Sequence, residues 1–302
     1  MTAADYLGDA ATGTGLQALR HVDLFNLLCV PPDVPDADTA TAVYVAALSL
    51  CVEQRAVLLV DPPVRWNAAN AQDPAAAVTA LGLAGGPARN AALYFPRLLL
   101  HEPGLTAPVQ RVPCGAVAGV IARTDANHGV WKAPAGSEAG LRDVLDLAVH
   151  LGSAEAATLN RVGINTLRRI GNRPALIWGA RTLGADDAGS DEYKYLPVRR
   201  TALHIEQSVV RGIAWAVFEA NNEALWAQLR VGVGEFLGSL FRQGAFHGST
   251  ARDAYFVRCD AQTTSDDDIR RGLCNLLIGF APLKPAEFVL LRIAQQTALP
   301  GR

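Results

Sequence analysis

The sequence lacks a hydrophobic run long enough to cross a bilayer. Its longest nearly apolar stretches, residues 42–52 and 273–283, are about 11 residues each, whereas a membrane-spanning helix needs about 20. The first basic residue is Arg20, so the segment before it has neither the charged part nor the apolar part of a signal peptide. We therefore expect no membrane insertion, and a chain that is made and folds in the cytoplasm.

Cysteine is scarce and widely spaced. The five cysteines form no CxxC pair and have no histidine nearby at the spacing of a zinc site: Cys29, Cys51, Cys114, Cys259 and Cys274. This pattern argues against a disulfide framework and against a structural zinc site. We expect buried free thiols and no bound metal.

The chain has no large excess of either charge. Its 27 basic and 29 acidic residues give a formal net charge of −2, and the isoelectric point is about 6.3, so the clustered basic surface of a nucleic-acid-binding protein is not expected. Residues 1–150 carry 9 basic and 14 acidic side chains, and residues 151–302 carry 18 and 15. This asymmetry permits head-to-tail packing of identical chains.

Motifs for nucleotide binding and catalysis are missing. The sequence has no GxxxxGK(S/T) and no GxGxxG after a strand. Cys114 would lie at a helix N-terminus with His128 as a conceivable base, and Asp61 would end a strand. None of the six histidines is spaced to pair with Asp61. We expect no cofactor and no enzymatic activity, with an α/β hydrolase-like enzyme as an alternative.

The first half alternates short apolar runs with amphipathic stretches. This pattern predicts strands at 23–30, 56–61 and 91–95 and helices at 40–54, 73–83, 112–124 and 138–151. Apolar strands that alternate with helices indicate a parallel sheet covered on both faces. The predicted fold class of this half is α/β.

The second half has longer helices followed by strands. The pattern predicts helices at 198–218 and 222–242, a short helix near Asp266, and strands at 174–181, 254–259, 273–280 and 286–296. This order indicates an α+β domain. With a boundary between Gly136 and Gly152, the predicted organisation is a poorly structured arm (1–20), an α/β domain (21–140) and an α+β domain (141–302).

A series of short motifs runs along the chain from residue 112 onward. The motifs are 112–125 (VPCGAVAGVIARTD), 129–136 (GVWKAPAG), 159–165 (LNRVGIN), 178–183 (WGARTL), Tyr195 with 199–200 (RR), 218–221 (FEAN) with 225–226 (LW), 244–248 (GAFHG), 255–260 (YFVRCD), 268–272 (DIRRG) and 281–289 (APLKPAEFV). These motifs resemble those of the contractile tail sheath family of phages, pyocins and phage-like injection systems. They also occur in the same order as in that family, which makes the resemblance specific.

The resemblance implies a subtilisin-like α/β domain without catalysis and an α+β domain that faces an inner tube. It further implies a structural subunit that polymerises helically around that tube and contracts to drive it into a target. The implied partners are further copies of the chain, the inner tube protein, and baseplate and tail-terminator proteins, within a phage tail or a phage-like particle that is released from the cell. A static sheath-like shell protein is the alternative.

One departure from the family pattern concerns the start of the chain. Family members usually begin with an extension whose strand inserts into a neighbouring subunit's sheet. Here residues 1–20 are rich in Gly, Ala and Thr and make a poor strand. The sequence therefore leaves two interpretations: the inserted strand is supplied in a different way, or the chain is a minimal or divergent sheath subunit without the usual connection between subunits.

Two segments are candidates for contacts in such an assembly. The final strand offers backbone groups for β-augmentation across chains, or is an ordinary strand of its own sheet; its candidate residues are Glu287, Phe288, Val289, Leu290, Leu291, Arg292 and Ile293. Contact with a tube must be reversible, which favours exposed charge pairs of about 0–1 kcal/mol each. The candidate residues, which otherwise form a solvated helix, are Asp266, Asp267, Asp268, Arg270 and Arg271.

Overall fold

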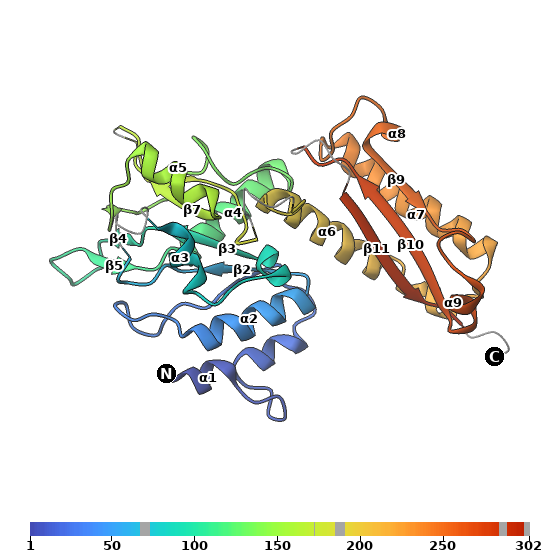
Figure 1. Cartoon of the computed structure of the whole chain (residues 1–302), viewed down its shortest axis with the longest axis horizontal. Helices are drawn as coiled ribbons and strands as arrows, with labels where there is room; N and C mark the ends of the chain where they lie inside the picture. Colours follow the sequence, from blue (N-terminus) through green and yellow to red (C-terminus); the bar gives the residue numbers. More distant parts are fainter. Residues whose placement is uncertain (67–72, 172, 185–190, 284–288, 299–302) are drawn as a thin grey trace. The chain divides into compact units, whose positions relative to one another are not determined.

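The computed structural model describes residues 1–66, 73–171, 173–184, 191–283 and 289–298. The chain forms two compact units, residues 1–200 and residues 201–302 (Figure 1). It passes from the first unit to the second within α6 (Leu196–Gly212). None of the helices in the described part of the chain has the length and apolar character of a membrane-spanning segment.

The first unit is built on a five-stranded sheet. Its strands, in spatial order, are β1 (Leu27–Cys29), β2 (Val57–Val60), β3 (Ala91–Phe95), β7 (Ile164–Arg168) and β8 (Leu176–Trp178). The first four pair in parallel, and β8 pairs with β7 in antiparallel orientation. Every residue of β2 and β3 is buried, which explains their continuous apolar sequence.

Helices cover both faces of this sheet. They are α2 (Thr41–Glu53), α3 (Pro74–Thr79), η3 (Gly86–Asn90), α4 (Cys114–His128) and α5 (Ser153–Arg161). Buried residues of α2, α3 and α5 share one core cluster with Leu58, Val60 and Leu93. Helix α4 contacts β1 and β2 but contributes no residue to that cluster. Because side chains alternate between the faces of a strand, α4 lies on the opposite face. The predicted two-sided α/β unit is confirmed.

The prediction of a poorly structured arm over residues 1–20 is wrong. The segment forms α1 (Ala3–Leu7) and η1 (Gly15–His21), and Leu16 joins the core of the first unit. Thr2 caps α1. A Cβ on Gly8 would lie 1.9 Å from the Thr14 carbonyl oxygen. The glycines therefore permit a tight turn between the two helical segments.

The prediction of a helix at 138–151 is also wrong. This segment contains β6 (Asp146–Leu147), which joins β4 (Leu98–Leu100) and β5 (Val109–Arg111) in a small antiparallel sheet of order β5-β4-β6. Gly140 forms a bridge with Leu176 beside the main sheet. Asp143 has a φ of 57°. A left-handed residue at that position interrupts a right-handed helix.

The division into units differs from the predicted domains. The predicted boundary at residue 140 lies inside the first unit, which extends to residue 200. The physical reason is strand pairing, because β7 pairs with β3, and β8 pairs with β7. The strands β7 and β8, which lie after residue 140, therefore complete the first sheet. Because β3 is far from β7 in the sequence, the residues around β7 carry no local signal of this pairing.

The second unit packs helices on one face of an antiparallel sheet. After α6 it contains η4 (Ala214–Phe218), α7 (Glu223–Arg242), α8 (Ala251–Ala254), β9 (Tyr255–Arg258), α9 (Asp266–Arg270), β10 (Leu273–Phe280) and β11 (Val289–Gln296). The sheet order is β11-β10-β9, and α7 contacts β9. The α+β class predicted for this part of the chain is confirmed.

Candidate functional site

The final strand, β11, lies at an edge of the second unit's sheet. It pairs with β10 from Val289 to Gln296 without interruption. Val289, Leu291 and Ile293 point into the core, whereas Leu290 and Arg292 are exposed. No strand in the described part of the chain pairs with the other edge of β11. Two of the predicted contact residues lie outside the described residues: Glu287 and Phe288.

The outer face of this sheet has a feature that sequence analysis missed. Arg258, Leu277 and Arg292 lie in one cross-strand row. In the next row the Phe256 ring covers Gly279, where a Cβ would lie 2.2 Å from the ring. A glycine at this point in a strand is the signal for such a close approach. Both arginines are exposed, so this face combines apolar and cationic groups.

Helix α9 is short and polar, as predicted. Ser265 caps it, donating a hydrogen bond of 2.7 Å from its hydroxyl to Asp268. Hydrogen bonds from Ser265 lower the pKa of Asp268. Asp267 forms ion pairs with Arg270 at 3.3 Å and with Arg271 at 2.7 Å. The predicted acidic helix start is therefore confirmed. Of the five residues proposed to contact a tube, Arg270 and Arg271 already form ion pairs with Asp267 within the same helix.

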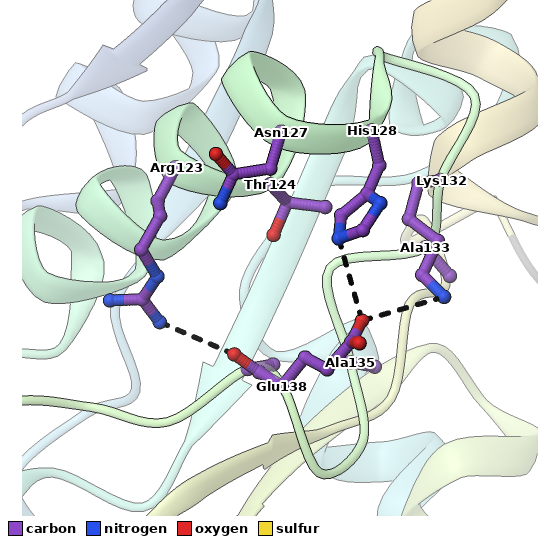
Figure 2. A pocket seen from close by; sticks show the side chains of 9 residues that line it. Arg123, Thr124, Asn127, His128, Lys132, Ala133, Ala135 and Glu138 are labelled. Atoms are coloured by element: carbon purple, nitrogen blue, oxygen red, sulfur yellow. Dashed lines mark hydrogen bonds and ion pairs between the residues drawn. The ribbon is translucent and has the colours of Figure 1, made fainter.

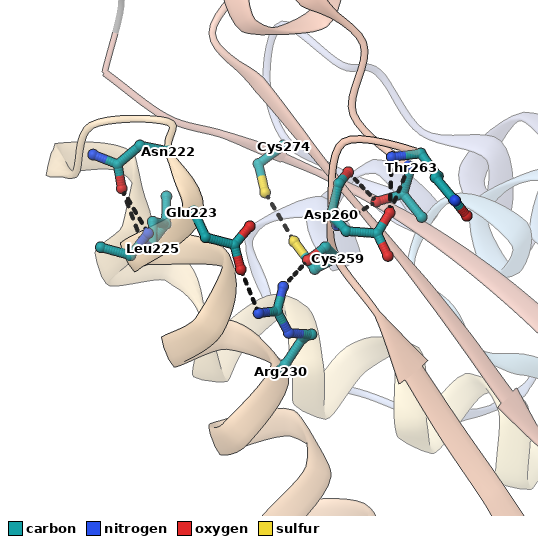
Figure 3. Close-up of polar contacts among 10 residues, drawn as sticks. Asn222, Glu223, Leu225, Arg230, Cys259, Asp260, Thr263 and Cys274 are labelled. Atoms are coloured by element: carbon teal, nitrogen blue, oxygen red, sulfur yellow. Dashed lines mark hydrogen bonds and ion pairs between the residues drawn. The ribbon is translucent and has the colours of Figure 1, made fainter.

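Polar side chains connect the start of α7 with β10 and with the residue that follows β9. Figure 3 shows the second connection, from Arg230 to the Cys259 carbonyl. The Asn222 side chain accepts hydrogen bonds from the first amides of α7. The Asn221 amide donates to the Leu273 carbonyl at 2.8 Å, and its oxygen accepts from the Trp226 indole at 2.8 Å. Arg230 donates to Glu223 and to the Cys259 carbonyl. Motif residues in this region therefore hold the unit together.

The first unit has a small polar pocket at the end of α4 (Figure 2). Its volume is about 30 Å³, whereas ligand sites have volumes of about 300–1,000 Å³. His128 and Lys132 each lie 3.7 Å from Glu138, and Arg123 donates to the Gly140 carbonyl at 2.7 Å. The pocket is an ion-pair cluster on the surface of the unit.

The candidate catalytic residues do not form a catalytic pair. Cys114 and His128 lie at opposite ends of α4, about 21 Å apart at 1.5 Å per residue. A hydrogen bond with Cys29 and burial raise the pKa of Cys114, which keeps the thiol protonated. The geometry therefore does not provide the activated thiolate that nucleophilic catalysis needs.

Asp61 is buried at the carboxyl end of β2. One carboxylate oxygen accepts a hydrogen bond from the Cys114 amide at 2.9 Å, and the other has no partner among the described residues. Burial raises the pKa of Asp61 to about 6. A cavity of about 110 Å³ lies beside it, partly lined by Tyr44 and Arg97. No group of three histidine, cysteine or acidic residues in the described part of the chain is arranged to hold a metal ion.

Comparison with known families identifies both parts of the chain. Residues 1–183 match the phage tail sheath protein central domain, and residues 189–296 match the phage tail sheath C-terminal domain. The chain is 26% identical over 295 residues to a putative prophage major tail sheath protein of Pseudomonas aeruginosa strain UCBPP-PA14. This alignment covers 93% of the chain and 69% of that relative.

Solved structures give the same result. The sheath of an extracellular contractile injection system (PVC) in its contracted state matches with a TM-score of 0.74 and 28% identity, over 92% of this chain and 73% of that one. The contracted helical sheath of the anti-feeding prophage matches with a TM-score of 0.71 and 32% identity, over 92% and 72%. The chain belongs to the phage tail sheath family and has the structural role of a contractile sheath subunit in a phage tail or phage-like particle.

Proposed function

We propose that this chain polymerises helically around an inner tube and contracts to drive that tube into a target. The observation that carries the proposal is the match of 92% of the chain to an injection-system sheath in its contracted state. The match includes both units, so it covers the sheath core and the C-terminal sheath domain together.

The work of contraction would come from the contacts between subunits. Burying apolar surface stabilises by about 25 cal/mol per Å² before the costs of ordering and desolvation are subtracted. A few hundred Å² of additional contact would therefore supply several kcal/mol per subunit. This source needs no nucleotide, cofactor or catalytic residue, and we propose that the protein has no enzymatic activity.

The proposed connection between subunits is β11, together with Glu287 and Phe288, which precede it in the sequence and lie outside the described residues. It is an edge strand, and only alternate side chains along it are buried. An edge strand presents unpaired backbone donors and acceptors to a strand of another chain. A connection made from backbone hydrogen bonds would persist while subunits rotate, as cooperative contraction requires.

The proposed tube contact is α9, with Asp266, Asp267, Asp268, Arg270 and Arg271. No residue of this helix is buried. The second unit has 10 basic and 10 acidic residues, so attraction to a tube would depend on local charges and not on the net charge of the unit. Exposed pairs of about 0–1 kcal/mol each would hold a tube in place and still release it.

The remaining partners follow from the same proposal. Baseplate and tail-terminator proteins would bind the ends of the sheath, and nucleic acid would not be a partner. The proposed place of assembly is the cytoplasm, with release of the completed particle afterwards.

Electron microscopy of the purified protein tests the proposal directly. We expect tubules of uniform helical pitch when the protein is concentrated with its cognate tube protein. A second, shorter and wider tubule form would support contraction, whereas a single form under all conditions would favour a static shell. Monomers or a discrete small oligomer beside intact tubes would overturn both.

A further inference from the structure

Two cysteines lie together inside the second unit. The sulfur atoms of Cys259 and Cys274 are 3.4 Å apart, and both residues are fully buried (Figure 3). Cys259 directly follows β9, and Cys274 is the second residue of β10. Extending the register of these strands by one residue places Cys259 opposite Leu276, whose side chain lies on the same face as that of Cys274. Strand pairing thus brings together two thiols that are distant in the sequence.

The surroundings distinguish the two thiols. A hydrogen bond from Cys259 lowers the pKa of Cys274, and a hydrogen bond with the Thr264 side chain lowers it further. The hydrogen bond to Cys274 and burial raise the pKa of Cys259. Cys274 is therefore the thiol that loses its proton first, and thiolates are the nucleophiles of thiol–disulfide exchange.

We propose that Cys259 and Cys274 form a reversible intramolecular disulfide when the subunit meets a low-molecular-weight disulfide such as oxidised glutathione. The Cys274 thiolate attacks one sulfur of oxidised glutathione, a mixed disulfide forms, and one glutathione thiolate leaves. The Cys259 thiol then gives its proton to the glutathione thiolate released in the first step and attacks the Cys274 sulfur, which releases the second glutathione as a thiolate. Two protein thiols are oxidised, and one glutathione disulfide is reduced to two thiols.

The geometry permits this step after a small movement. A disulfide needs its sulfur atoms at about 2.05 Å, so the pair must approach by little more than 1 Å from its present separation. Since both thiols are buried, the oxidant must enter through local opening. The connection between Cys259 and Cys274 contains α9, which has no buried residue. Segments with few buried contacts open most readily.

The disulfide would close the loop that carries α9. Cross-linking a loop of this length restricts the unfolded chain, and we expect the unfolding temperature of the second unit to rise by about 10–20 °C. It would also restrict movement of α9 relative to β10. The oxidised and reduced subunits would therefore differ mainly at the surface formed by α9.

The experiment uses the purified full chain with oxidised glutathione. After quenching with acid and blocking free thiols with N-ethylmaleimide, proteolysis and mass spectrometry should identify a linked Cys259–Cys274 peptide pair. Dithiothreitol should reverse the link and the rise in unfolding temperature. Cys274→Ser should abolish both, whereas Cys51→Ser, a change at another buried cysteine, should retain both.

The wild-type chain alone can overturn the proposal. Five maleimide-blocked cysteines after prolonged exposure would do so, as would glutathione adducts without the link, or a link between other cysteines. The measurement needs neither tube nor tubules. Its failure would leave the proposed sheath function unaffected, and failure of assembly would leave the thiol pair unaffected.

Discussion

Every residue of β2 and β3 in the first unit is buried, whereas in the second unit buried and exposed residues alternate along most of β11. The β8 edge of the first sheet is covered by residues 136–141, through backbone hydrogen bonds of 2.8–3.1 Å. The β11 edge of the second sheet has no partner strand in the described part of the chain. Changes in the first sheet should therefore affect folding, and changes at the second sheet should affect assembly.

Asn165 in the first sheet gives the largest expected effect on stability. It is fully buried, and its amide donates to the Leu93 and Arg181 carbonyls and accepts from the Arg181 amide. Asn165→Leu would leave these groups unpaired, so we expect the free energy of unfolding to fall by about 3–5 kcal/mol. Urea unfolding measures this. The same change at the exposed Asn127 should cost no more than about 0.5 kcal/mol, and equal losses would contradict the assignment.

Asp61 gives the next largest effect on stability, and this effect depends on pH. Its folded pKa of about 6 lies above the ordinary aspartate value of 3.8, so the folded state binds the proton more tightly. The stabilisation from this proton is complete below pH 3.8 and is lost as the pH rises through 6. The loss is about 3 kcal/mol. Asp61→Asn should reduce the dependence of the unfolding free energy on pH between pH 3.8 and about 6. An unchanged dependence would contradict the assignment of this effect to the buried Asp61 carboxyl group.

Charge reversal on α9 should affect folding less. Exposed ion pairs contribute about 0–1 kcal/mol each, so Arg270→Glu with Arg271→Glu should lower the stability by about 1 kcal/mol or less. Co-sedimentation with the tube protein should nevertheless fall clearly. A control with the same change in net charge is Arg242→Glu with Arg252→Glu, at two exposed sites. Equal tube binding by both double variants would exclude α9 as the contact.

Leu290→Lys on β11 should have the smallest effect on folding. Leu290 is 49% exposed, and surface changes usually alter stability by no more than about 0.5 kcal/mol. A lysine on an edge strand opposes the addition of another strand, so microscopy should show loss of tubules, whereas Leu290→Ala should retain them. Deleting residues 286–302 is a less selective test because it also removes Val289, Leu291 and Ile293 from the core. Normal tubules from the lysine variant would contradict β-augmentation at β11.

Local sequence patterns predicted most of the elements. The strand predicted at 91–95 is β3, and the helix predicted at 40–54 is α2. The strand is a continuous apolar run that is buried throughout, and the helical segment is too long for a typical strand, so the signal lies within each segment itself. The short helix at Asp266 was also predicted because its acidic start suits the helix dipole.

Features that depend on distant pairing could not be predicted from the sequence. The predicted boundary at residue 140 differs from the observed one because nothing in the sequence near β7 indicates that this strand pairs with β3. The turn at Gly8 depends on the close approach of Thr14, which composition alone does not show. The Cys259–Cys274 contact likewise depends on the register of β9 and β10. The roles proposed for α9 and β11 depend on other chains and stay predictions.

The long pairing of β10 with β11 has a mechanical consequence. The two strands run antiparallel and stay in register from Leu273–Gln296 to Phe280–Val289. A pull along the axis of β11 would load all these residue pairs together, in shear, whereas a pull across the strand would separate them one after another. A subunit pulled along β11 during firing would therefore resist rupture with the combined strength of the whole ladder.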